Sequence, residues 1–259
     1  MTIELENVSV SFDFPKTEVL KNLNFKINER EVVAMLGYSG AGKSTIIKII
    51  SSFIKPTTGK AKINGNEIEK GHPYKKLGYL CQSSEKMLFP WLTVEQNVLY
   101  SLKLRGELNP MTRKYCNGLI ESLNLSHRTK SYPYKLSGGE QKRLSLAVVL
   151  SYQPDLLLLD EPFAGLDLEL TKNLWDVLYK EFETEKPTVL FVTHSLDEAA
   201  LLANRTVFIT KSQTLLKDSM KAADFNIPLT FPRYELLNHP SVIAYKQHLL
   251  SLFNQSLNE

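Results

Sequence analysis

The chain has 259 residues, of which 43% are hydrophobic and 23% are charged, so it can bury the core of a globular domain. Its 31 basic and 28 acidic residues leave a net charge of +3, which is too small to indicate a nucleic-acid-binding protein. No stretch approaches the roughly 20 apolar residues of a membrane-spanning helix, and we expect no secretory signal at the start. The cysteines Cys81 and Cys116 have no metal-binding spacing, so we expect two reduced thiols.

The first 50 residues predict strands followed by one helix. Apolar and polar residues alternate at the start, which is typical of β-strands with one buried face. A short apolar run then stops at Gly37, and isoleucines at helical spacing follow it. We expect strands at 3–12, 19–27 and 31–36 and a helix at 46–50.

Residues 83–155 predict helices separated by prolines, whereas strands and helices alternate on both sides of this middle part. Because the later strands are apolar throughout, they favour a largely parallel sheet covered on both faces, with the helical middle as an insertion. We expect further strands at 77–81, 156–159, 188–193 and 206–210, and helices at 93–104, 111–123, 139–152, 168–182, 196–203 and 241–253. Residues 226–240 predict a loop because they contain three prolines.

A phosphate-binding motif lies between the strand at 31–36 and the helix after it. It matches the pattern G-x-x-x-x-G-K-[ST] in full and consists of Gly37, Tyr38, Ser39, Gly40, Ala41, Gly42, Lys43, Ser44 and Thr45. Glycines let several backbone N–H groups face one phosphate chain, and the helix adds its positive end. We expect Lys43 to meet the β- and γ-phosphates and the Ser44 hydroxyl to ligate Mg²⁺.

Two acidic residues, Asp160 and Glu161, follow the four leucines of a predicted buried strand. Such a strand can deliver Asp160 beside the phosphate loop, where it would hold Mg²⁺ through water. Glu161 then suits a general base for the attacking water. The alternative is an acidic turn that ends a core strand, and the phosphate loop upstream argues against it.

A second glycine pair lies at 136–143, where the sequence is Leu136-Ser137-Gly138-Gly139-Glu140-Gln141-Lys142-Arg143. Ser137 is suited to cap a helix whose first N–H groups the glycines leave exposed. This segment resembles the LSGGQ signature of the ABC ATPases, and the motif order along residues 2–215 is that of the family. The resemblance implies an α/β fold: a P-loop NTPase (RecA-like) core with an N-terminal antiparallel β-subdomain and an inserted all-helical subdomain. The implied boundaries are 1–82 and 156–215 for the core with its β-subdomain, 83–155 for the helices and 216–259 for a C-terminal extension.

The resemblance also implies cofactors and residue roles. ATP and Mg²⁺ are the family's cofactors, and the phosphate loop of one subunit holds ATP that a second subunit covers with Ser137, Gly138, Gly139 and Glu140. Gln82 is similar to the Q-loop glutamine, which senses Mg²⁺ and the γ-phosphate, and His194 is similar to the switch histidine at the γ-phosphate. Asp167 resembles the D-loop aspartate of the dimer interface. Phe12, or alternatively Phe14, resembles the aromatic that stacks on adenine, although Phe12 also suits a core position in a strand.

The segment 89–98 resembles a stretch of the ATPases of nitrate, sulfonate and taurine importers, and 227–233 is weakly similar to their endings. This implies a homodimer or paired cassettes on the cytoplasmic face of the membrane, held there by integral-membrane permease subunits. An extracytoplasmic solute-binding protein is a further expected partner, and no nucleic acid is expected. The alternatives are a soluble ABC ATPase acting on nucleic acid or ribosomes, a regulatory module with poor hydrolysis, and the ATPase of an exporter. The sequence leaves the solute open.

Overall fold

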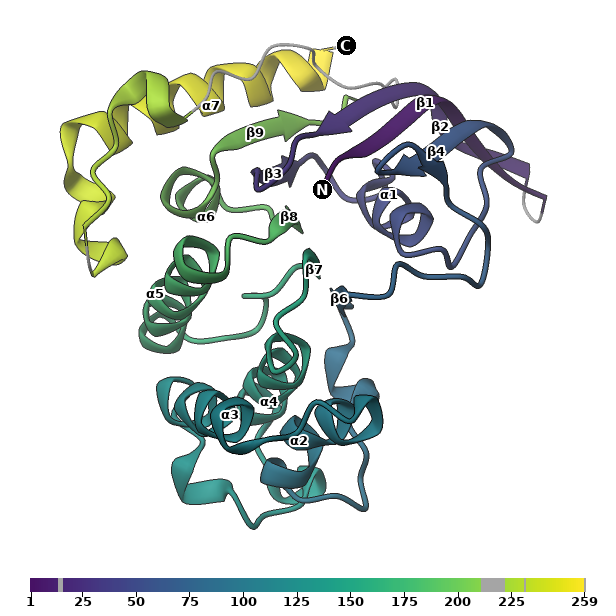
Figure 1. The fold of residues 1–259 in the computed structure, drawn as a ribbon. Coiled ribbons are helices and arrows are strands. Elements are labelled where there is room, and N and C mark those ends of the chain that lie inside the picture. The colour runs from purple at the N-terminus through teal and green to yellow at the C-terminus, as the bar shows by residue number, and fades with distance from the viewer. Residues whose placement is uncertain (14–15, 211–221, 231, 259) are drawn as a thin grey trace.

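The computed structural model describes residues 1–13, 16–210, 222–230 and 232–258. Its centre is a parallel sheet of five strands in the order β6-β7-β8-β3-β9 (Figure 1). These strands are β3 (Val32–Leu36), β6 (Leu77–Leu80), β7 (Leu156–Asp160), β8 (Thr188–Val192) and β9 (Arg205–Phe208). The carboxyl ends of parallel strands share one edge of the sheet, so the loops after β3, β6, β7 and β8 meet there.

Both faces of this sheet are covered, and every residue of β3, β7 and β8 is buried. Successive side chains of a strand point to opposite faces. Leu157 and Phe191 accordingly pack with the later helices, whereas Leu158 and Leu190 pack with the first helix and the N-terminal sheet. This two-sided burial explains why the strands are apolar throughout.

The N-terminal part forms an antiparallel sheet in the order β2-β1-β4-β5. Its strands are β1 (Ile3–Asp13), β2 (Lys16–Ile27), β4 (Thr58–Ile63) and β5 (Asn66–Glu67), and helix α1 (Lys43–Ile50) shares their core. Ile3 pairs with Ile27 on one side and with Ile63 on the other. The strands at 58–67 were not predicted from the sequence. One face of this sheet is solvated, and the few apolar residues of β4 alternate with lysines, so the signal is weak.

The inserted helices form a separate layer beyond β6 and β7 (Figure 1). They are α2 (Val94–Arg105), α3 (Pro110–Ser122) and α4 (Gly138–Leu150), with the 3₁₀ turns η1 (Ser84–Met87), η2 (Ser126–Arg128) and η3 (Pro133–Lys135). Thr93, Asn109 and Ser137 begin the three helices, each with reciprocal side-chain and backbone hydrogen bonds. The predicted α/β class, N-terminal antiparallel sheet and helical insertion are therefore confirmed.

The C-terminal part packs against α5 (Leu168–Glu185) and α6 (Leu196–Leu202). It contains the turns η4 (Ala222–Phe225) and η5 (Arg233–Asn238) and the helix α7 (Pro240–Asn258). Buried Arg233 holds it in place by donating to the Leu201 carbonyl at 3.0 and 2.5 Å and to the Pro228 carbonyl at 2.6 Å. Its guanidinium also lies 4.0 Å from the centre of the Tyr179 ring. The loop predicted at 226–240 thus includes one 3₁₀ turn.

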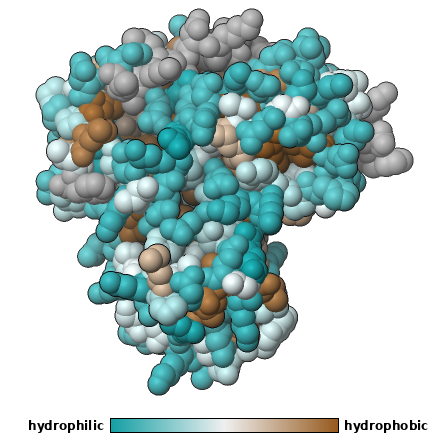
Figure 2. Space-filling model, viewed as in Figure 1, coloured by the Kyte–Doolittle hydropathy of each residue, from teal (hydrophilic) through white to brown (hydrophobic). Residues whose placement is uncertain are grey.

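The face shown in Figure 2 is mostly hydrophilic, and its hydrophobic side chains form small separate patches. Within the described residues, every helix is too short or too polar to cross a membrane.

Candidate functional site

The phosphate motif forms the loop between β3 and α1, and its glycines have positive φ where the chain turns. Gly42 precedes α1 with φ 95°. A Cβ atom there would lie 2.7 Å from Leu20 Cδ2 and 2.9 Å from the Val19 carbonyl oxygen, so both the backbone angle and the space exclude a larger residue. Ser39 and Gly40 are exposed, which leaves the loop accessible to a ligand.

The Lys43 ammonium lies within this loop. Its Nζ donates to the carbonyl oxygens of Gly37 at 2.7 Å and Tyr38 at 2.8 Å, and the side chain is buried. Burial lowers the pKa of Lys43, while the charges of Glu161 and Asp160 act in the opposite direction. A buried ammonium in a loop whose residues Ser39 and Gly40 are exposed is suited to bind a phosphate chain.

Ser44 and Asp160 bring two oxygen ligands together from distant parts of the sequence. Ser44 lies in the first turn of α1, Asp160 ends β7, and the Ser44 hydroxyl donates to Asp160 Oδ1 at 3.3 Å. Burial raises the pKa of Asp160, and the hydrogen bond from Ser44 partly opposes that rise. Because a buried carboxylate needs a compensating charge, the pair suits a hard cation.

Glu161 contacts two polar side chains, His194 and Gln82, for which the family resemblance implied roles at the γ-phosphate. Its Oε1 lies 3.0 Å from His194 Nε2, and its Oε2 accepts a hydrogen bond from Gln82 Nε2 at 3.3 Å. Glu161 also has a positive φ of 54°, and its N–H donates to the Val192 carbonyl at 3.1 Å. Non-glycine residues in this backbone region concentrate at functional sites. The ends of β6, β7 and β8 thus converge on one carboxylate.

The signature segment begins helix α4 and makes no hydrogen bond or ion pair with residues 37–45 in the part of the chain described. Ser137 Oγ accepts from the Glu140 N–H at 3.2 Å, and Glu140 Oε2 accepts from the Ser137 N–H at 2.8 Å. Burial acts to raise the pKa of Glu140, but hydrogen bonds from Ser137 and Arg128 outweigh it, and the pKa falls to about 2. The structure therefore gives Glu140 a capping role, while Gly138 and Gly139 leave N–H groups at the helix start.

The remaining predicted residues take no part in the contacts of Glu161 with His194 and Gln82. Asp167 begins α5, where its Oδ1 accepts from the Leu170 N–H at 2.9 Å. Phe12 lies on β1 with 44% of its surface exposed, so the alternative of a core position is wrong. Phe14 lies outside the described residues. Thr45 is half-buried in α1, and Tyr38 is half-buried against the N-terminal core.

Two residues that sequence analysis did not single out also reach the site. Lys142 of α4 donates to the Glu161 carbonyl at 2.9 Å and to the Ala164 carbonyl at 2.7 Å. Glu198 of α6 is hydrogen-bonded to the Thr193 hydroxyl, and burial raises the pKa of Glu198 to about 7. A lysine or glutamate within a helix carries no sequence signal that distinguishes it from a surface residue.

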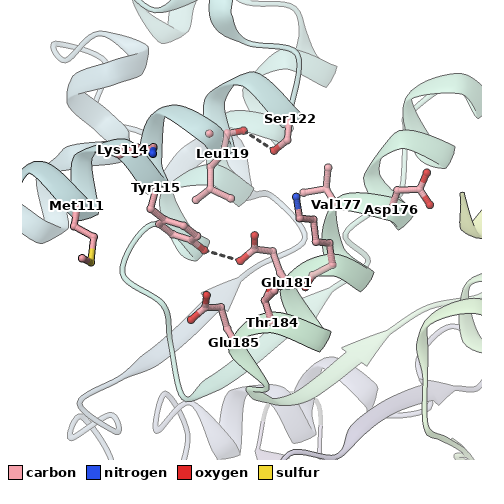
Figure 3. Close-up of a pocket in the computed structure, with 12 residues that line it drawn as sticks. Met111, Lys114, Tyr115, Leu119, Ser122, Asp176, Val177, Glu181, Thr184 and Glu185 are labelled. Carbon is pink, nitrogen blue, oxygen red and sulfur yellow. Dashed lines mark hydrogen bonds between the residues drawn. The ribbon is translucent and has the colours of Figure 1, made fainter. Parts of the chain in front are cut away.

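A hollow of about 290 Å³ adjoins the cluster and is lined by Glu161, His194 and Glu198 among others. A larger hollow of about 600 Å³ lies between α3 and α5, beside the hydrogen bond of 2.6 Å from the Tyr115 hydroxyl to Glu181 (Figure 3). Its lining contains none of the phosphate-loop, signature or carboxylate residues. We place the functional site at the smaller hollow, because convergent charged groups indicate a reacting centre better than volume does.

Comparison with known proteins agrees with this geometry. Residues 20–164 match the family model described as ABC transporter. The aliphatic sulfonates import ATP-binding protein SsuB of Bacillus licheniformis is 42% identical over 195 residues, which cover 75% of this chain and 74% of that protein. SsuB of Bacillus subtilis is 34% identical over 99% of this chain and 95% of that protein. The nitrate import ATP-binding protein NrtC of Synechocystis is 34% identical over 98% of this chain and 38% of that protein.

Among solved structures, the dimeric ATP-binding cassette MJ0796 bound to ADP and Pi has a TM-score of 0.74 and 28% identity. The match covers 85% of this chain and 98% of that one. The fold, the phosphate loop and the sequence similarity agree: the chain belongs to the ABC transporter family, as one of its ATP-binding proteins.

Proposed function

We propose that this chain hydrolyses ATP as the motor subunit of an ABC importer of the sulfonate and nitrate type. The observation that carries the proposal is the contact of Glu161 with His194 and Gln82, beside the Ser44–Asp160 pair. A phosphate-binding loop, an oxygen site for a cation and a carboxylate base are the three parts that hydrolysis of a nucleoside triphosphate requires. The relatives with import functions support the direction of transport.

Each part has a separate task in this site. Lys43 and the N–H groups of 37–45 bind the phosphates, and Phe12 offers an exposed ring for the adenine. The Ser44 hydroxyl and the Asp160 carboxylate fit Mg²⁺, which prefers hard oxygen ligands and shares its shell with water and phosphate. The described residues contain no group of three or more His, Cys, Asp or Glu side chains that could hold a metal ion. Mg²⁺ would neutralise charge on the phosphates.

Glu161 is the proton acceptor for the attacking water. His194 and Gln82 hold its two carboxylate oxygens, and we assign them contacts with the γ-phosphate and the cation. General base catalysis contributes about 10²–10⁴ in rate, so loss of the Glu161 carboxylate should slow hydrolysis by about that factor.

The signature residues act on a second chain. Ser137, Gly138 and Gly139 form a helix start that, among the described residues, makes no hydrogen bond to the phosphate loop of the same chain, and helix starts bind anions. A head-to-tail dimer places this end over the partner's ATP. The MJ0796 structures, which are dimeric, support this arrangement. We assign Asp167 to the same interface.

The permease would dock on the helical insertion. Trp91 is 68% exposed there, and the Phe89 ring lies 5.3 Å from the Trp91 ring and 4.7 Å from the Tyr100 ring between centres. A hollow of about 540 Å³ is lined by Leu99 and Tyr100 among others. Exposed aromatic anchors are typical of protein interfaces. We place the chain at the cytoplasmic membrane face through this contact, with an extracytoplasmic solute-binding protein beyond the permease.

Affinity capture tests this function. The Glu161→Gln chain, tagged and expressed in its host, should retain MgATP and co-purify with a multi-span permease from solubilised membranes. Trp91→Ala is the matched control and should lose the permease while the isolated chain keeps its ATPase rate. Recovery of ribosomal or DNA-associated proteins in place of a membrane protein would overturn the transport function and leave the ATPase chemistry intact.

A further inference from the structure

Helix α4 contacts two segments of its own chain, the one that follows Gln82 and the one that begins at Glu161. Its first turn is the signature, whose start Ser137 caps. One turn later Lys142 binds the carbonyls of Glu161 and Ala164, at 2.9 and 2.7 Å. A further turn on, the Ser145 hydroxyl donates to the Ser84 carbonyl at 2.9 Å, in the segment after Gln82. One rigid element therefore carries the signature and holds the segments that follow Gln82 and Glu161.

The Lys142 charge is held by main-chain oxygens. The described residues place no carboxylate within 4.0 Å of its Nζ, although Glu161, Glu85 and Glu198 face it at longer range. Burial lowers the pKa of Lys142, and those three carboxylates oppose the shift. A half-buried ammonium that donates to two carbonyls forms charge-assisted bonds, which are stronger and more directional than neutral ones.

The Glu161 backbone depends on two supports. Its N–H is bonded to Val192 of the core sheet at 3.1 Å, and its carbonyl is bonded to Lys142 of the helical insertion. Its φ of 54° is one that non-glycine residues rarely adopt. A strained backbone persists only when its surroundings hold it, so we expect a shift of α4 relative to the sheet to move the Glu161 main chain and, with it, the carboxylate.

We propose that Lys142 is a positioning residue that transmits occupancy of the signature to the catalytic carboxylate of the same chain. The inference rests on the proposed function, in which the signature binds the ATP of the partner while Glu161 acts on the ATP of its own chain. ATP bound between the phosphate loop of one chain and the signature of the other then orders the Glu161 carboxylate of the chain that supplies the signature. The two ATP sites of the dimer are coupled through Lys142, and hydrolysis at each site depends on ATP bound at the other.

Steady-state and binding measurements on the full chain test this role. Lys142→Met removes the donors and keeps the side-chain length, and Lys142→Arg restores a cationic donor. Arg105→Met is the matched control, because Arg105 also joins the helical insertion to a main-chain carbonyl, that of Lys75 at 3.2 Å, away from the site. We would measure kcat, the equilibrium affinity for ATP, the Hill coefficient of hydrolysis and the melting temperature for each variant.

Misplacement of a catalytic group by about 1 Å can lower a rate by about 10²-fold, so Lys142→Met should lower kcat by about 10- to 100-fold. Its ATP affinity should change by less than about threefold, and its Hill coefficient should fall toward that of independent sites. Lys142→Arg should recover most of the rate, and Arg105→Met should resemble the unmodified chain. If Lys142→Met does not fold, the comparison of Lys142→Gln with Lys142→Arg replaces it.

Two outcomes would overturn the inference. One is an unchanged kcat and Hill coefficient in Lys142→Met. The other is a parallel loss of rate, affinity and melting temperature that Arg105→Met shares, which would mean a general structural role. Failure of the proposed function is separate, because the unmodified chain would then hydrolyse no ATP or Glu161→Gln would leave its rate intact.

Discussion

Replacement of Glu161 by glutamine isolates the proton acceptor from the rest of the site. The amide has the size of the carboxylate and can still form hydrogen bonds with His194 and Gln82, which lie 3.0 and 3.3 Å from the two oxygens. Among the described residues, the side chains of Lys43, Ser44 and Asp160 make no hydrogen bond to Glu161. The substitution therefore removes the base and leaves the binding groups in place.

The expected loss of rate follows from the role of Glu161 as the general base. Loss of a general base lowers the rate by about 10²–10⁴-fold, which corresponds to about 3–5 kcal/mol of transition-state stabilisation. Phosphate release under saturating MgATP measures kcat, and equilibrium titration with ATP measures affinity, which should change by less than about threefold. Glu181→Gln is the matched control, since Glu181 is also a partly buried glutamate that accepts a hydrogen bond, from Tyr115 at 2.6 Å. A near-normal rate in Glu161→Gln, or an equal loss in Glu181→Gln, would refute the assignment.

Three further predictions concern binding, pH and the C-terminal part. Lys43→Ala should weaken ATP binding by about 10- to 100-fold, because a charged hydrogen bond is worth about 1.5–3 kcal/mol, and unchanged affinity in calorimetry would contradict the phosphate-loop assignment. Glu198 has its pKa raised from 4.5 to about 7 in the folded chain, so the folded state holds its proton longer than the unfolded state does. The free energy of unfolding should consequently fall, by at most about 3 kcal/mol, as the pH rises from 4.5 to 7, and denaturant titrations should show a smaller fall in Glu198→Gln. Arg233→Met leaves the carbonyls of Leu201 and Pro228 without their donor and should destabilise the packing of the C-terminal part by about 1–3 kcal/mol. Limited proteolysis should then remove that part earlier than in the unmodified chain, and identical cleavage rates would argue against this role of Arg233.

Local sequence was sufficient wherever the signal is short-range. A strand of four leucines, a glycine loop before an isoleucine-rich helix and a serine before two glycines each predict their own element, because burial, backbone freedom and capping are decided within a few residues. The structure confirms the α/β fold and the helical insertion that were predicted from these local signals. The weakly patterned β4 and β5 were missed, since β4 joins the sheet by a long-range pairing with β1 and β5 is a strand of two residues that pairs only with β4.

The motifs by themselves determined that this chain has a phosphate loop, a carboxylate pair and a capped glycine helix start, and their order indicated the family. Only the tertiary structure decided that Ser44 meets Asp160 across 116 positions, that Glu161 touches both Gln82 and His194, and that Lys142 holds the Glu161 carbonyl. These contacts depend on the order of the parallel strands and on where α4 packs. Side-chain distances between separate elements are set by the packing of the whole core, which no single segment encodes.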